Sequence, residues 1–236
     1  MSIRTRAGKR AQRYFEVALR CSQQSANWDL WADAYSNPSR MLAYCGDGDT
    51  ALTMSQQSQI RPDRLSPLAR ACMTVVEAIA HGRCGDAQSC LAAVRRAEEH
   101  FASAVPANET ATMLDFFSPA ELAGDSGYAL LPLAMRGQHV GTTVELLRSA
   151  ATSYPADKAR SRGLTELRLA SLLLTHGDPA EAVAMATGAL DDVGSVRSRR
   201  IADLLTNLQR RTGDPRHRCV AGIAPLRHRI SDTLAV

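Results

Sequence analysis

The sequence has few of the residues that favour β-sheets. Among 236 residues there are 12 Val and 6 Ile, and aromatic residues make up only 5%, whereas Ala occurs 38 times and Leu 26 times. β-Branched and aromatic side chains are enriched in strands, while Ala and Leu are strong helix formers. The composition therefore predicts an all-α protein.

Long apolar segments are also missing. No run approaches the roughly 20 residues that a membrane-spanning helix needs. The first residues, Met1-Ser2-Ile3-Arg4, lack the apolar stretch of a secretory signal peptide. We therefore expect a cytoplasmic protein that has no contact with a membrane.

Motifs for catalysis or cofactor binding are scarce as well. There is no Gly-x-Ser-x-Gly, no phosphate-binding loop with Lys and no His-Glu-x-x-His. Gly46-x-Gly48-x-x-Ala51 superficially resembles a dinucleotide fingerprint, but the two Asp residues within it would repel a pyrophosphate. His81, Cys84 and Cys90 lack a fourth ligand at a zinc-site spacing. We expect neither a cofactor nor a metal, and the sequence identifies no catalytic residue.

Charge is unevenly distributed along the chain. The formal net charge is +5 in residues 1–20, −7 in residues 21–192 and +6 in residues 193–236. Basic ends are typical of nucleic-acid contact. Many of these Arg residues, however, lie at solvent-facing positions of amphipathic helices, so we expect no nucleic-acid binding by this chain alone. A role for Arg197–Arg229 within a DNA-bound complex stays open.

A degenerate repeat extends over most of the chain. Gly46, Gly82, Gly137 and Gly177 each mark a turn, which is followed by a segment with helical apolar periodicity. A small or short side chain occurs five residues after each Gly, and another seven residues later. Residues seven apart share one helix face, and small residues there let a neighbouring helix approach closely. The pairs are Ala51 and Ser58, Ala87 and Val94, Thr142 and Ser149, and Ala182 and Ala189.

The repeat predicts a single helical-repeat domain over residues 1–236. Short loops between its helices imply antiparallel neighbours that stack into a solenoid of about ten to eleven helices. An irregular insertion is expected at residues 104–125. The predicted helices cover residues 6–23, 27–44, 49–59, 66–81, 86–103, 119–136, 140–153, 157–176, 179–192, 196–212 and 216–234.

These helix pairs resemble tetratricopeptide repeats, with Ala182 and Ala189 at the motif's two small positions. A second resemblance covers nearly the whole chain. It is carried by the segments Ala11–Leu19, Phe117–Gly124, His176–Ala182 and Val196–Arg200. It resembles the C-terminal tetratricopeptide-like domain of actinobacterial helix-turn-helix transcriptional regulators. The resemblance implies a sensing or protein-binding role. The DNA-binding domain of those regulators is not recognisable here, so DNA binding is not carried over.

Residues 1–24 match only the second helix of a repeat, with Ala11, Phe15 and Ala18 on one face. Such an orphan helix would expose Phe15, Val17 or Leu19, and solenoid ends with an apolar surface are usually covered. One expectation is a homodimer through this helix or packing elsewhere on the chain. The alternative is a short paralogue that binds a partner through this end.

Tetratricopeptide geometry places first-helix residues about 13, 10, 6 and 3 positions before the turn Gly on the concave groove. Aromatic residues of 27–44 lie on or beside the first of these strips, and the groove changes from polar and aromatic to apolar along the chain. Such a surface suits a peptide, a protein or a small apolar ligand. The alternative for the tryptophans is packing between helices, which is the usual place of aromatic residues at helical spacing. The candidate groove residues are Trp28, Trp31, Asp33, Ser36, Arg40, Tyr44, Cys72, Val76 and Ser171.

Two functions follow from these observations. The first is a non-catalytic regulatory, sensor or scaffold module that binds a peptide, a protein partner or a small apolar ligand, linked to transcriptional regulation or secondary metabolism. The alternative is an enzyme that uses the groove as a substrate pocket with acid–base residues.

Overall fold

The computed structural model describes residues 6–104, 114, 116–193 and 198–235. These residues form eleven α-helices and three short 3-10 helices, and none of them lies in a strand. The prediction of an all-α protein is confirmed. The chain divides into two compact units, Met1–Ser118 and Pro119–Val236, and we describe each unit by itself. One solenoid running through residues 1–236 stays a prediction.

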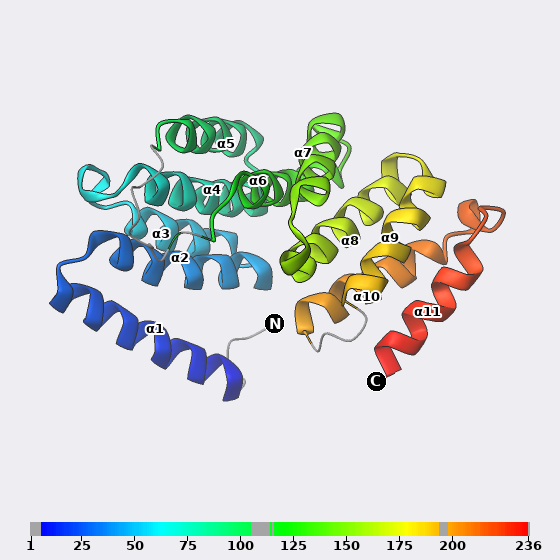
Figure 1. The fold of residues 1–236 in the computed structure, drawn as a ribbon, viewed down its shortest axis with the longest axis horizontal. Coiled ribbons are helices and arrows are strands. Elements are labelled where there is room, and N and C mark those ends of the chain that lie inside the picture. The colour runs from blue at the N-terminus through cyan, green and yellow to red at the C-terminus, as the bar shows by residue number, and fades with distance from the viewer. Residues whose placement is uncertain (1–5, 105–113, 115, 194–197, 236) are drawn as a thin grey trace. The chain divides into compact units, whose positions relative to one another are not determined.

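In the first unit, every helix packs on its neighbour in the chain, and α2 also packs on α4. Contacts between successive helices and between helices two apart are the pattern of stacked helical hairpins. Its helices, labelled in Figure 1, are α1 (Arg6–Ser25), α2 (Trp28–Cys45), α3 (Gly48–Ser58), α4 (Pro67–Cys84) and α5 (Ala87–Ala102).

The second unit is also formed by contacts between successive helices and between helices two apart, although α9 packs mainly on α8 and α11. Its α8 contacts α6, α7, α9 and α10, and α11 packs on α9 and α10. The helices are α6 (Pro119–Ala134), α7 (Val140–Ser153), α8 (Ala159–His176), α9 (Pro179–Val193), α10 (Arg199–Thr212) and α11 (Ile223–Ala235) (Figure 1).

Two predicted boundaries are wrong. The irregular segment does not reach residue 125, because α6 already begins at Pro119, a residue that suits the first turn of a helix. The last helix begins at Ile223 and not at residue 216. Pro215–His217 form a 3-10 turn there, and Gly222 has a left-handed φ of 82° that separates this turn from α11.

The turn between α2 and α3 shows how the sequence ends one helix and starts the next. Gly46 has a φ of 92°, a left-handed conformation that favours Gly. The side chain of Asp47 then caps α3 by accepting a hydrogen bond from the backbone N–H of Thr50 at 3.1 Å. Gly85 and Asp86 repeat this arrangement after α4. The prediction that Gly82 marks this turn is wrong, because Gly82 is buried within α4.

The observed positions of the turns explain which of the small residues in the second helix of each pair are buried. Counted from Gly85, the positions five and twelve residues later are Cys90 and Ala97, both fully buried. After Gly137 the turn has one additional residue before the helix. Thr143 and Ala150 are therefore buried in place of the predicted Thr142 and Ser149. The other two predicted pairs, Ala51 with Ser58 and Ala182 with Ala189, are buried as expected.

The central helix of each unit is buried on almost every side. In α4 the stretch Ala71–Val76 is buried throughout, and in α8 the stretch Leu169–Leu174 is buried throughout. A helix that is apolar all round is stable only where other helices cover it. Each unit is therefore built around one inner helix, with amphipathic helices packed on it.

Helix α1 presents apolar side chains to solvent, as the sequence predicts. Val17 is 57% exposed and Tyr14 is 65% exposed, whereas Phe15 and Leu19 are half-buried on a helix that packs on α2. Covering of this face by a second copy stays a prediction. No helix in the described part of the chain has the length and apolar character needed to cross a membrane.

Substitutions at two glycines of the second unit test how closely its helices pack. A Cβ at Gly163 in α8 would overlap the side chain of Val193 in α9, whereas a Cβ at Gly188 in α9 meets nothing within 4 Å. We expect Gly163→Ala to lower the free energy of unfolding by about 1–3 kcal/mol through overpacking. We expect Gly188→Ala to raise it by about 0.5–1 kcal/mol, because Ala favours the helix. Urea unfolding followed by circular dichroism measures both, and a stabilising Gly163→Ala would contradict the described contact of α8 with α9.

Candidate functional site

A pocket of about 360 Å³ lies in the first unit where α1 meets α2. Both tryptophans of the chain line it, together with Ser22, Ala26 and Asn27. Its volume falls at the lower end of the range of small-molecule pockets. Of the predicted groove residues, Trp28 and Trp31 are therefore brought together at a concave surface.

The local sequence explains why the two indole rings meet there. Ala26 adopts a left-handed φ of 50°, which ends α1, and Asn27 caps α2 by accepting a hydrogen bond from the N–H of Leu30 at 3.0 Å. Residues three and four apart lie on the same helix face. The ring centroids of Trp28 and Trp31 are accordingly 6.2 Å apart, and those of Trp31 and Tyr35 are 5.0 Å apart.

The indole N–H of Trp31 is an unpaired donor. Its Nε1 atom is out of contact with solvent and has no hydrogen-bond acceptor among the described residues. Buried polar groups are nearly always hydrogen-bonded, so one without a partner calls for an explanation. Because solvent does not reach this atom, the N–H belongs to the packing around Trp31 and not to the surface of the pocket.

The connection between α3 and α4 lies beside Trp28. The guanidinium of Arg61 is 5.6 Å from the centroid of the Trp28 ring. Arg61 also donates two hydrogen bonds to Asp63, at 2.9 and 2.7 Å, and this pairing lowers the pKa of Asp63 to about 2. The N–H of Ser66 donates to Asp29 in α2 at 3.0 Å, which attaches this connection to the helix that carries both tryptophans.

The predicted polar residues of α2 largely satisfy one another. The buried Ser36 donates to the backbone carbonyl of Asp33 at 3.1 Å, and Asn37 donates to the Asp33 carboxylate at 3.0 Å. Burial raises the pKa of Asp33, although Ser36 and the charge of Arg40 oppose this shift. Arg40 and Tyr44 are half-buried farther along the helix. These residues do not line the pocket.

Three predicted groove residues lie in the cores of their units. Cys72 and Val76 in α4 are 1% and 0% exposed, and Ser171 in α8 donates to the carbonyl of Leu167 at 2.8 Å. They leave no surface for a ligand, because α4 and α8 are the inner helices. Counting from Gly85 does not change this result, since the four positions reached are also buried, namely Cys72, Val75, Ile79 and Gly82.

The sequence analysis missed Ser22, Ala26 and Asn27. Ser22 lies four residues after Ala18, so it continues the inner face that was recognised at Phe15 and Ala18. Asn27 directly precedes the apolar periodicity of α2, which is the position of a helix cap. The helix-face position of Ser22 and the cap position of Asn27 can both be recognised in the sequence, but neither of them indicates a cavity.

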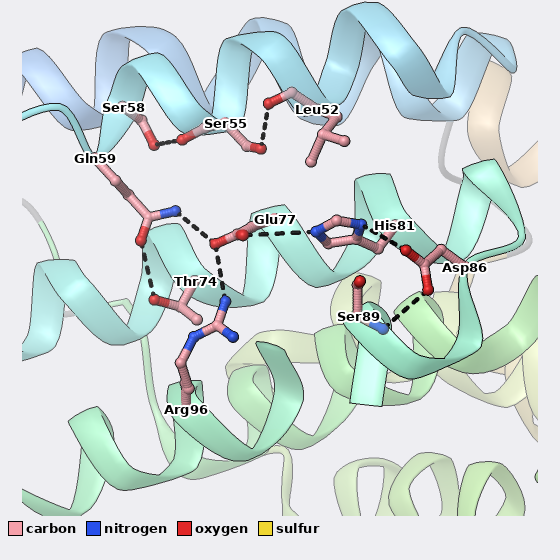
Figure 2. A network of polar contacts seen from close by, with 10 residues as sticks. All are labelled: Leu52, Ser55, Ser58, Gln59, Thr74, Glu77, His81, Asp86, Ser89 and Arg96. Atoms are coloured by element: carbon pink, nitrogen blue, oxygen red, sulfur yellow. Dashed lines mark hydrogen bonds and ion pairs between the residues drawn. The ribbon is translucent and has the colours of Figure 1, made fainter. Parts of the chain in front are cut away.

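A second polar cluster connects three helices of the first unit (Figure 2). Glu77 in α4 accepts hydrogen bonds from Gln59 after α3 at 3.0 Å and from Arg96 in α5 at 3.3 Å. Its other carboxylate oxygen is 3.6 Å from Nε2 of His81, whose Nδ1 is 3.8 Å from Asp86. Only 17% of the Glu77 side chain is exposed. The cluster is suited to holding α3, α4 and α5 together.

This cluster predicts a clear effect on stability. Glu77→Ala removes the acceptor for Gln59 and Arg96 and should lower the free energy of unfolding by about 2 kcal/mol. Glu99→Ala removes an exposed carboxylate from α5 and should change it by less than about 0.5 kcal/mol. Tryptophan emission during urea unfolding measures both, because both tryptophans lie in this unit. Equal effects of the two substitutions on the free energy of unfolding would show that the polar cluster around Glu77 does not stabilise the unit.

In the second unit, Glu166 of α8 is the most perturbed carboxyl group. Desolvation and the nearby charge of Asp192 raise its pKa to about 7, although Arg162 opposes the shift. Its Oε2 atom is buried and has no hydrogen-bond partner among the described residues. Arg162 itself is paired with Asp192 at 2.6 and 2.8 Å.

Because the pKa of Glu166 is raised, we expect the stability of the second unit to depend on pH. Folded Glu166 retains its proton between pH 4.5, its usual pKa, and about pH 7, where the unfolded chain has lost it. Stability is consequently lost as the pH rises through this window. Glu166→Gln should gain on the order of 2 kcal/mol over the wild type between pH 4 and pH 8. The exposed Glu145→Gln on α7 serves as the control. Urea unfolding at each pH measures the difference, and a constant offset of Glu166→Gln would contradict the shifted pKa.

Comparisons of the chain with protein-family models, with curated proteins and with solved structures found no match. The resemblance to the repeat domain of helix-turn-helix regulators therefore stays a prediction.

Proposed function

We propose that the protein is a non-catalytic binding module that takes up a small molecule, or a side chain of a peptide, in the pocket lined by Trp28 and Trp31. The observation that carries this proposal is the pocket of about 360 Å³ whose walls include both tryptophans of the chain. A regulatory or scaffold role, as the sequence resemblance implies, is part of the proposal.

The chemistry of the pocket supports selective binding. Aromatic side chains provide a large apolar contact area, and a few fixed polar groups orient a ligand. Among the described lining residues, Ser22 and Asn27 supply the polar groups. A ligand with an apolar body and a polar group matches this lining.

The polar groups that line the pocket favour binding over catalysis. The Ser22 hydroxyl donates to the carbonyl of Leu19 at 2.8 Å, and the Asn27 side chain caps α2. Proton transfer needs a titratable side chain within reach of the bound substrate. The described residues that line the pocket include no carboxyl, imidazole or amine side chain.

The test is a screen of metabolites and short peptides by tryptophan emission. We expect at least one compound to shift the emission of the wild type, since the chain's only two tryptophans report on the pocket. Calorimetry should then show about tenfold weaker binding to Trp31→Phe, which replaces the indole ring of the lining with a smaller ring.

Tyr35→Phe is the matched control, because its ring contacts Trp31 but does not line the pocket. Affinity for this variant should match the wild type. The proposal would be refuted if no compound altered the emission, or if Trp31→Phe and the wild type bound the same compound equally well.

A further inference from the structure

Helix α1 packs on α2 in the way that α3 packs on α4. In the first unit a first helix and the second helix that follows it form a pair, as α2 does with α3 and α4 does with α5. Helix α1 matches a second helix, and the described residues include no first helix that precedes it. In Figure 1 it lies at the edge of the first unit, beside α2. The repeat therefore defines, next to α1, the position that a first helix would take.

One face of α1 presents apolar side chains to solvent. Tyr14, Val17 and Cys21 are exposed, and their spacing of three and four residues places them on one helix face. Tyr14 and Val17 are the most exposed large apolar side chains among the described residues. The pocket is lined from a different face, because Ser22 lies four residues after Ala18 on the less exposed side of α1.

Positive charge borders these apolar side chains. Arg13 and Arg20 are both exposed, and they lie four residues before and three residues after Val17. The whole helix contains five basic residues and one acidic residue, Glu16, which gives a net charge of +4. The outer face of α1 is thus a basic surface with an apolar centre. It consists of Arg13, Tyr14, Val17, Arg20 and Cys21.

The charge of α1 distinguishes between the possible occupants of this face. Two copies of the chain that met through α1 would bring two helices of net charge +4 together, and like charges across an interface disfavour binding. A helix with acidic residues beside an apolar stripe would instead pair its carboxylates with the guanidinium groups. A helix that lies in a membrane surface buries a broad apolar face. The larger Phe15 and Leu19 of α1, however, are half-buried on the side away from Val17.

From these observations we propose that the outer face of α1 docks an acidic amphipathic helix of a partner protein, at the position of the first helix of this pair. The inference goes beyond the pocket and does not depend on it. Apolar residues of the partner, spaced by three and four positions, pack on Tyr14 and Val17. Asp or Glu residues beside them pair with Arg13 and Arg20.

The experiment uses two designed helical peptides as probes of the full chain. Both carry Leu at spacings of three and four residues, and the positions beside the Leu stripe are Glu in one peptide and Lys in the other. Fluorescence anisotropy of the labelled peptides measures binding. We expect the Glu peptide to bind about tenfold more tightly than the Lys peptide and to bind less tightly as salt is added. Equal affinities of the two peptides, or no binding of the Glu peptide, would overturn the proposal.

Matched substitutions test the apolar centre of the outer face. Val17→Gln removes an apolar contact without changing the charge and should weaken binding of the Glu peptide about tenfold. Ile60→Gln is the control, because Ile60 is 56% exposed against 57% for Val17 and lies outside α1. This variant should bind the peptide as the wild type does. Both side chains are exposed, so both variants should fold, which circular dichroism verifies. Equal affinities of the two variants would contradict docking at α1.

A second pair of variants tests the charge. Arg13→Glu and Arg20→Glu, made together, should reverse the preference, so that the Lys peptide binds more tightly than the Glu peptide. Arg64→Glu and Arg95→Glu together change the charge of the same unit by the same amount at exposed positions outside α1. This control should keep the preference of the wild type. A preference that the first pair leaves unchanged would refute the pairing with Arg13 and Arg20.

Two further measurements separate a partner helix from the other occupants. We expect the chain alone to sediment as a monomer and not to bind vesicles of phosphatidylglycerol and phosphatidylcholine. Self-association that Val17→Gln abolishes would overturn the proposal and assign the outer face to a second copy. Vesicle binding that the same substitution abolishes would overturn it in favour of a membrane surface.

Discussion

Close packing of helices around α4 and α8 is the constraint on which the rest of the structure depends. The stretches Ala71–Val76 of α4 and Leu169–Leu174 of α8 are buried on every side, so several helices must cover them, and these can approach only where side chains are small. Cys90 and Ala97 on α5, and Ala182 and Ala189 on α9, fulfil this requirement as fully buried residues. Burial of such side chains is the main source of stability in this kind of repeat.

The same constraint determines where a binding site can form. Val76 of α4 and Leu172 of α8 are fully buried, so these residues contribute only to the core. Helix α2 carries both tryptophans and packs on α1, α3 and α4, but it is less completely buried than α4. Large aromatic rings fit there because they need not pass between closely packed helices. The pocket is thus a consequence of bulky side chains at the margin of a unit built from small ones.

Much of this arrangement was predictable from local sequence. The apolar period and the Gly-Asp turns predict the helices, because a left-handed Gly and an Asp cap end and begin them whatever surrounds them. The turn at Gly82 was misplaced since Gly85 offers the same signal three residues later, and only packing decides between the two. Thr142 was predicted to be buried but is exposed, because the turn after Gly137 has one additional residue. The apolar periodicity of the sequence does not reveal the length of a turn.

The site was harder to predict. The spacing of Trp28 and Trp31 predicts that their rings share a helix face, and the short distance between the rings confirms this prediction. The assignment of Cys72, Val76 and Ser171 to a groove depended on how the helices stack, which one sequence does not determine. Whether a face is open or covered is a property of tertiary packing, and so is the isolation of the Trp31 indole N–H.

Amide hydrogen exchange followed by mass spectrometry tests the central claim about the inner helices most directly. The account predicts that peptides from α4 and α8 exchange most slowly in their respective units, because their hydrogen bonds open only when a whole unit unfolds. Peptides from α1, whose outer face exposes Tyr14 and Val17, should exchange much faster. Rapid exchange in α4 or α8, or exchange at one uniform rate throughout a unit, would contradict this account.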